Sequence, residues 1–115
     1  MKKVRVVLSP EAEEVYNYLN AQAPKSKIEK SILSALTKKT ELIKANPHYG
    51  NPISKDKIPQ EYCKKYGITN LFRVELPNFW RMLYSLTDSE SRIEIIAFVL
   101  EISDHNKYSK RFKYN

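Results

Sequence analysis

Two short segments that alternate apolar and polar side chains, separated by Pro77-Asn78, constrain the fold more than any other feature of the sequence. Side chains point alternately to the two faces of a strand, so such segments on either side of a turn-forming pair predict a β-hairpin. The predicted strands are Leu71 to Leu76 and Trp80 to Leu86. One face of the hairpin is wholly apolar or aromatic and is expected to belong to the core: Phe72, Val74, Leu76, Trp80, Met82, Tyr84 and Leu86.

The chain before this hairpin predicts one strand and two helices. The β-branched segment Lys3 to Leu8 indicates a strand. Ser9-Pro10 is typical of a helix start, and Pro24 ends that helix. Ser26 begins a second helix with capping-box spacing, and Asn46-Pro47 ends it. The apolar stripe of the second helix comprises Ile28, Ile32, Leu36 and Ile43, with Leu33 beside it.

Residues 46–66 look irregular, and a helical turn is expected within Ile58 to Tyr66. After the hairpin, a turn at Asp88-Ser89 leads into a last strand from Arg92 to Ile102. The order predicts an α+β fold: an N-terminal strand, two antiparallel helices, and a three-stranded antiparallel meander within one twisted sheet. The 115 residues suit one domain, residues 1–115.

Composition narrows the classes of function. Cys63 is the only cysteine and no Cys/His cluster has metal-site spacing, so we expect no disulfide, metal or other cofactor. Arg5 interrupts the apolar stretch Val4 to Leu8, which is too short for a signal peptide. A cytoplasmic protein with no membrane partner is expected. The net charge of +7 favours a polyanionic or acidic partner, although a well-solvated basic surface explains it equally well.

The second face of the hairpin carries the polar residues that suggest chemistry. It presents Arg73, Glu75 and Arg81, together with Leu71, Leu83 and Ser85. For a three-residue loop we expect Arg73 directly opposite Arg81, an unfavourable pairing of like charges unless an anion or Glu75 lies between them. Guanidinium groups match phosphate oxygens, so the pair could bind phosphate. The alternative is a solvated outer face with an ordinary Arg–Glu pair.

The C-terminal segment concentrates polar and aromatic residues just past the last strand. His105 can exchange a proton near neutral pH, and Tyr108 can stack on a base or orient a phosphate. Lys110 and Arg111 add positive charge. The alternative for His105 is a surface histidine paired with Asp104.

The order of elements and several segments resemble the RelE/ParE superfamily of type II toxins. The segment from Leu71 to Tyr84 resembles the strand–turn–strand signature of that family, with an aromatic-Arg pair before an apolar-apolar-Tyr run. Phe98 to Tyr108 resembles its last strand and tail, and the loop from Asn46 to Pro52 resembles its helix-to-sheet connection. In the RelE branch, the resemblance implies metal-independent cleavage of mRNA in the ribosomal A site, by attack of a 2′-hydroxyl on the adjacent phosphorus. A cognate antitoxin is the implied protein partner, in a hetero-oligomer with the toxin.

The resemblance also implies residue roles. Arg81 matches the phosphate-contacting arginine, and Arg73 matches a basic position on the preceding strand. Tyr108 matches the C-terminal tyrosine, and His105 falls where relatives carry Arg or His, so it is the candidate acid. Glu75 departs from a lysine in one branch: it is either the base or a sign of weakened activity. Contacts to mRNA or ribosomal RNA are expected from the basic residues Lys55, Lys57, Lys64, Lys65, Lys110 and Arg111.

Two other functions stay open at this point. A ParE-type protein poisons DNA gyrase, but that branch generally lacks the basic and aromatic tail that follows Ser103. A non-catalytic member of the superfamily would use its basic face only to bind RNA or an acidic partner, and Glu75 keeps this possibility open.

Overall fold

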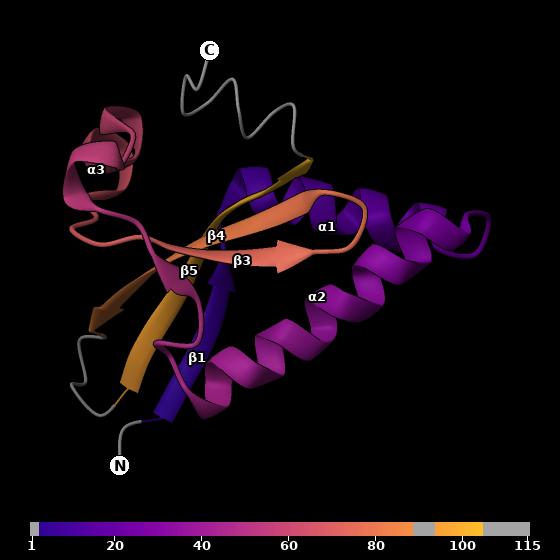
Figure 1. The fold of residues 1–115 in the computed structure, drawn as a ribbon, viewed down its shortest axis with the longest axis horizontal. Coiled ribbons are helices and arrows are strands. Elements are labelled where there is room, and N and C mark those ends of the chain that lie inside the picture. Colours follow the sequence, from indigo (N-terminus) through magenta and orange to yellow (C-terminus); the bar gives the residue numbers. More distant parts are fainter. Residues whose placement is uncertain (1–2, 89–93, 105–115) are drawn as a thin grey trace.

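In the computed structural model, which describes residues 3–88 and 94–104, a twisted sheet carries two helices on one face (Figure 1). The elements follow in the order β1 (Lys3–Leu8), α1 (Pro10–Gln22), α2 (Lys27–Ala45), β2 (Asn51–Pro52), the 3-10 turn η1 (Lys55–Lys57), α3 (Gln60–Tyr66), β3 (Phe72–Leu76), β4 (Trp80–Asp88) and β5 (Glu94–Asp104). The α+β class and the order of the strand, two helices and three strands are confirmed. The segment 46–66 contains more regular structure than expected, namely β2, η1 and α3, of which α3 lies within the predicted helical turn from Ile58 to Tyr66.

The described sheet has five strands in the order β1-β5-β4-β3-β2, of which β2 is only two residues long. The strands β3, β4 and β5 form the expected antiparallel meander. The first strand, β1, pairs in parallel with the last, β5, with Val4 beside Ile95 and Leu8 beside Val99. The connection between these two parallel strands therefore contains both helices and the rest of the sheet.

Local sequence signals fix where the first two helices start. The Oγ of Ser9 accepts a hydrogen bond from the backbone N–H of Ala12 at 3.0 Å, so Ser9 is the N-cap of α1. The Oγ of Ser26 accepts from the N–H of Glu29 at 3.5 Å and caps α2 in the same way. Both predicted N-caps are confirmed.

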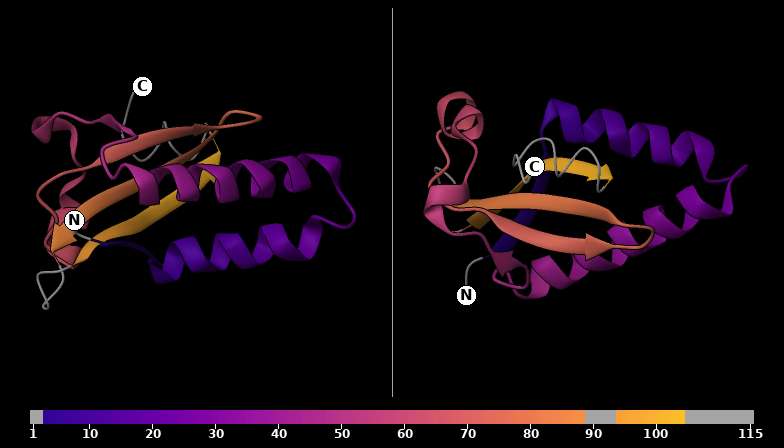
Figure 2. Two further views of the ribbon diagram at one scale, coloured as in Figure 1. Left: turned by 90° about the horizontal axis from the view of Figure 1, so that it is seen from below. Right: turned by 45° about the horizontal axis from the view of Figure 1, so that its top comes forward.

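Both helices pack on the same face of the sheet (Figure 2), where they form the helix-side core. The buried members of this core include Ala12, Leu19, Ile32, Leu36 and Ile43 from the helices and Phe72, Val74, Leu76, Met82 and Tyr84 from the hairpin. The remaining two residues of the predicted apolar face, Trp80 and Leu86, are partly buried against it.

One member of the predicted α2 stripe does not reach this core. Ile28 is 53% exposed, because it lies in the first turn of α2, next to the α1–α2 turn and beyond the edge of the sheet (Figure 1). Periodicity gives the direction in which a side chain points, but not how far the layer beneath the helix extends.

The second face of the hairpin is not open along its whole length. Leu71 and Leu83 pack with Ile58 and Tyr62 in what we call the α3-side cluster. Leu83 is 0% exposed, as are its neighbours Met82 and Tyr84 on the helix side. The middle of β4 is therefore buried on both faces. The alternative of a solvated outer face is wrong for this half of the hairpin, because the segment before β3 folds over it.

The loop before β2 is attached to β4 through Tyr84. The buried hydroxyl of Tyr84 donates a hydrogen bond to the carbonyl oxygen of Pro47 at 2.7 Å and accepts one from the N–H of Gly50 at 2.9 Å. A Cβ at position 50 would lie 2.9 Å from Cε1 of Tyr84 and 3.1 Å from the carbonyl oxygen of Arg73. Only glycine allows this close approach of the loop to the sheet.

Candidate functional site

The candidate site is an Arg–Glu–Arg cluster on the face of the β3–β4 hairpin that points away from α1 and α2. Leu76 pairs with Trp80, so Glu75 lies opposite Arg81 and Arg73 lies opposite Leu83. The expectation that Arg73 lies directly opposite Arg81 is wrong. A three-residue turn between Leu76 and Trp80 places Glu75, two residues further along β3, opposite Arg81. Opposite charges are thus paired across the strands, which is the favourable arrangement.

Glu75 contacts both guanidinium groups. Its Oε2 lies 3.1 Å from Nη1 of Arg81, and its Oε1 lies 3.8 Å from Nε of Arg73. The side chains differ in exposure: 15% for Arg81, 36% for Arg73 and 56% for Glu75. Because the carboxylate is the most accessible of the three groups, it can move aside from the arginines more easily than they can move from it.

Arg81 is the best anchored residue of the cluster. It lies on β4 between Trp80, which packs against the helix-side core, and Leu83 in the α3-side cluster. Its Nη1 also donates to the backbone carbonyl of Trp80 at 3.3 Å, and the backbone of β5 pairs with it at Ser103. A guanidinium held in this way presents its fork in a fixed direction, which favours recognition of a carboxylate or phosphate.

The predicted tail residues, His105, Tyr108, Lys110 and Arg111, lie outside the described residues. The last described residue, Asp104, pairs with Trp80 across β4 and β5. His105 therefore follows directly in the chain after a position beside the arginine cluster.

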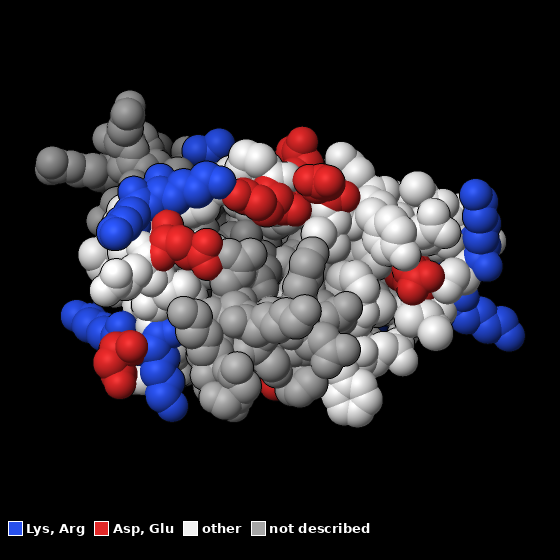
Figure 3. Space-filling view, turned by 90° about the horizontal axis from the view of Figure 1, so that it is seen from above, with Lys and Arg blue, Asp and Glu red and all other residues white. Residues whose placement is uncertain are grey.

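The four lysines predicted to contact RNA lie on η1 and α3. All four are exposed: Lys55, Lys57, Lys64 and Lys65. Figure 3 shows that Lys and Arg side chains gather at the two ends of the face seen from above, with acidic side chains among and between them. The positive charge is therefore divided between separate regions of this face.

Lys65 differs from the other three because it is part of an ion-pair cluster that joins α3 to the start of α1. Its Nζ hydrogen-bonds to Oε2 of Glu11, and the hydroxyl of Tyr66 donates to Oε1 of Glu11 at 2.7 Å. These hydrogen bonds lower the pKa of Glu11 from 4.5 to about 2, and the one from Lys65 has the largest effect. The same contact raises the pKa of Lys65, whereas desolvation is the main cause of the raised pKa of Tyr66. Lys65 thus has a structural contact in addition to any role in binding RNA.

Two ring side chains near the hairpin, those of Tyr84 and His48, contact structural parts of the domain. Burial raises the pKa of Tyr84, whose hydroxyl is held by the loop before β2. The ring of His48 lies edge-on to Phe72, with 5.7 Å between centroids. Since Phe72 belongs to the helix-side core, His48 is on the opposite side of the sheet from Arg81.

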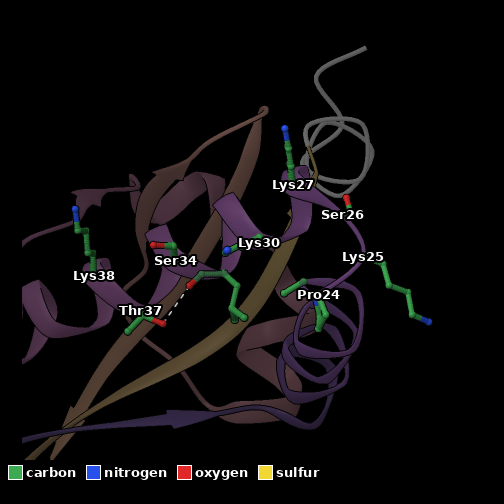
Figure 4. A pocket seen from close by; sticks show the side chains of 10 residues that line it. Pro24, Lys25, Ser26, Lys27, Lys30, Ser34, Thr37 and Lys38 are labelled. Atoms are coloured by element: carbon green, nitrogen blue, oxygen red, sulfur yellow. Dashed lines mark hydrogen bonds between the residues drawn. The ribbon is translucent and has the colours of Figure 1, made fainter.

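A hollow with a volume of about 800 Å³ lies elsewhere, at the α1–α2 turn. Figure 4 shows Lys25 and Lys27 at the turn and Lys38 further along α2, and Lys30 also contributes to the lining. Sequence reasoning did not group these lysines, because one lies in the turn and the other three are spread along α2. The lining has no arginine, carboxylate or aromatic side chain, so the hollow lacks the groups that the hairpin combines.

Within residues 3–88 and 94–104, no three His, Cys, Asp or Glu side chains are close enough together to hold a metal ion. Cys63 is an exposed free thiol on α3. The helices in the part of the chain that the structure describes are too short or too polar to span a membrane.

Comparisons with protein-family models, with curated proteins and with solved structures each give no significant match. The function must therefore be inferred from the chemistry of the Arg73–Glu75–Arg81 cluster and from the sequence motifs around it.

Proposed function

We propose that this chain is a RelE-like toxin of a type II toxin–antitoxin system, an endoribonuclease that cuts mRNA on the ribosome without a metal ion. The observation that carries the proposal is Glu75 between two guanidiniums on the second face of the hairpin. The same hairpin contains the segment that resembles the RelE/ParE signature. The strand–helix–helix–meander order is compatible with that fold, and the cytoplasm, where ribosomes are, is the proposed location.

The proposed reaction needs a base, positive charge and an acid. The carboxylate of Glu75 accepts the proton of the 2′-hydroxyl, whose oxygen attacks the adjacent phosphorus. Arg81 and Arg73 stabilise the negative charge that develops on the phosphorane oxygens. The bond from phosphorus to the 5′-oxygen breaks, and His105 donates a proton to that oxygen, while Tyr108 orients the substrate. A cyclic 2′,3′-phosphate and a 5′-hydroxyl end are formed.

A second candidate function has a specific observation in its favour. The carboxylate of Glu75 already pairs with both arginines and offsets one of their two positive charges, which reduces their attraction for a phosphate. In this alternative the domain binds RNA through its basic side chains but does not cut it. Binding would then be strongly salt-dependent, because phosphate contacts release counterions.

Replacing Glu75 separates the two functions. If Glu75 is the base, Glu75→Gln lowers cleavage of mRNA on programmed ribosomes by about 10²- to 10⁴-fold, the usual contribution of general-base catalysis. If Glu75 only competes with phosphate, the same change tightens RNA binding, and the wild-type protein does not cut. Glu41→Gln is the matched control, because Glu41 is an exposed carboxylate paired with Lys44 at 3.2 Å on α2.

Two further measurements test the remaining parts of the proposal. Arg81→Lys keeps the charge but removes the fork, so it should reduce cleavage while the folded domain is retained. Primer extension on cellular mRNA after induction separates RNA cleavage from poisoning of gyrase: intact messages together with inhibited DNA supercoiling would support the gyrase-directed function instead. An acidic protein encoded next to this gene, and co-purifying with the chain, is the expected antitoxin.

A further inference from the structure

The turn that joins β3 to β4 has an unusual backbone. The N–H of Trp80 donates to the carbonyl oxygen of Pro77 at 3.3 Å, so Asn78 and Phe79 are the two central residues of this turn. Both have positive φ, 59° for Asn78 and 64° for Phe79. Positive φ at both central positions is typical of a type I′ turn, for which Asn-Gly is the preferred pair. Phe79 therefore occupies the position that usually holds glycine.

The side chain of Phe79 is also unusually exposed, at 73%. An aromatic residue in the left-handed region is an outlier, because its Cβ crowds the following carbonyl oxygen. Glycine at this position would relieve the crowding and remove an apolar ring from water. A strained and exposed side chain at a tight turn points to a functional requirement for that side chain.

Phe79 lies beside the candidate site. It is two residues before Arg81 in the chain, so their Cα atoms are at most roughly 7.2 Å apart, and the pair Glu75–Arg81 is the second one back from the turn. A nucleobase and its own phosphate are separated by a similar length. The ring and the guanidinium are thus close enough to contact the two ends of one nucleotide.

We propose that Phe79 is a stacking platform for an unpaired nucleobase of single-stranded RNA, whose phosphate binds at Arg81 and Arg73. This inference rests on the proposed function, since it names how the same site holds its substrate. Aromatic side chains next to cationic groups are the usual means of binding single-stranded nucleic acid, because every base has a face on which a ring can stack. Asn78 in the turn and the pair Glu75–Arg81 behind it are polar or charged, which fits a nucleotide better than an apolar protein anchor.

The test compares Phe79→Gly with the wild-type protein, using decaadenosine RNA and an abasic chain of the same length and charge as probes. Loss of stacking on one base corresponds to a drop in affinity of about 5- to 150-fold for decaadenosine. Affinity for the abasic chain should not change. The Tm of Phe79→Gly should be unchanged or higher, because glycine suits the turn.

A second variant gives a direct readout of stacking. Trp80 is the only tryptophan, so the double change Phe79→Trp with Trp80→Phe moves the single fluorophore to the turn. Decaadenosine should quench its fluorescence, and the abasic chain should not.

Several outcomes would overturn the inference. Unchanged affinity of Phe79→Gly for decaadenosine would refute it and would assign the exposed ring to a protein partner. Equal loss of affinity for both probes, or a Tm lowered by Phe79→Gly, would make Phe79 a structural residue. Phe79-dependent binding without cleavage on ribosomes would support the inference and refute only the nuclease, whereas no binding of either probe would refute the inference, and cleavage on programmed ribosomes decides the nuclease separately.

Discussion

Tyr84→Phe tests whether the buried hydroxyl that holds the loop before β2 stabilises the domain. The change removes one oxygen atom and no carbon, so the ring can still pack in the helix-side core. It deletes the hydrogen bonds to the carbonyl of Pro47, at 2.7 Å, and from the N–H of Gly50, at 2.9 Å.

The expected cost follows from the burial of the two partners. A buried donor or acceptor left without a partner costs about 1–3 kcal/mol. Gly50 is buried, so its N–H bears the full cost, whereas Pro47 is half-buried and water can partly solvate its carbonyl. We expect the free energy of unfolding to fall by about 2–3 kcal/mol, and Tm by about 8–12 °C for a domain of this size.

Urea unfolding followed by the fluorescence of Trp80 measures this change. The matched control is Tyr49→Phe, because Tyr49 is exposed and its hydroxyl accepts a hydrogen bond from Lys39 at 2.9 Å. The control should cost less than about 0.5 kcal/mol, as is usual for surface changes. If Tyr84→Phe costs no more than the control, the buried hydrogen bonds do not hold the loop and the reasoning is refuted.

The pH dependence gives an independent check. Burial raises the pKa of Tyr84 above 10.0, so the folded state retains its proton more strongly than the unfolded state. The resulting stability is complete below pH 10 and is lost as the pH rises through the folded pKa. The phenylalanine variant has no such loss, and its deficit relative to wild type should shrink above pH 10.

Glu11→Gln should lower the free energy of unfolding only slightly at pH 6, because exposed ion pairs contribute little. The pKa of Glu11 is lowered from 4.5 to about 2. The loss of stability should therefore persist above pH 4.5 and vanish as the pH falls toward 2. Acid titration of unfolding midpoints, with Glu13→Gln in the same helical turn as control, measures this, and a deficit that survives at pH 2 would contradict the assigned pairing. Leu83→Ala should cost about 2–4 kcal/mol and speed tryptic cleavage after Lys64 and Lys65, because Leu83 anchors α3. Ile43→Ala, which truncates an equally buried side chain on the other face of the sheet, should not speed cleavage at those lysines to the same extent, and equal rates would count against a separate α3-side cluster.

Patterns along the sequence were sufficient to predict which residues form the helix-side core. Period-two alternation assigned the apolar face of the hairpin, and capping residues placed the starts of α1 and α2 at Ser9 and Ser26. Both signals depend on neighbours within a few residues, so the sequence contains all the information they need.

Contacts between distant segments could not be read in this way. The parallel pairing of β1 with β5 and the position of α3 over Leu83 depend on residues far apart in the chain. The sequence did hold one indication of this packing: the apolar residues Leu71 and Leu83 lie on the otherwise polar face of the hairpin. The pairing of Glu75 with Arg81 was predictable, since the three-residue turn determines it once the residues are counted from Leu76.

The two-sided burial of β4 has a consequence for how this domain can change through evolution. Four consecutive residues, from Met82 to Ser85, are at most 2% exposed. A strand in an ordinary two-layer domain has one tolerant face, where substitutions accumulate freely, but this stretch has none. Substitutions are therefore expected to be tolerated only beyond this stretch, which ends next to Arg81 and the turn before it. The residues that could alter what the protein binds are thus next to those that can least be altered.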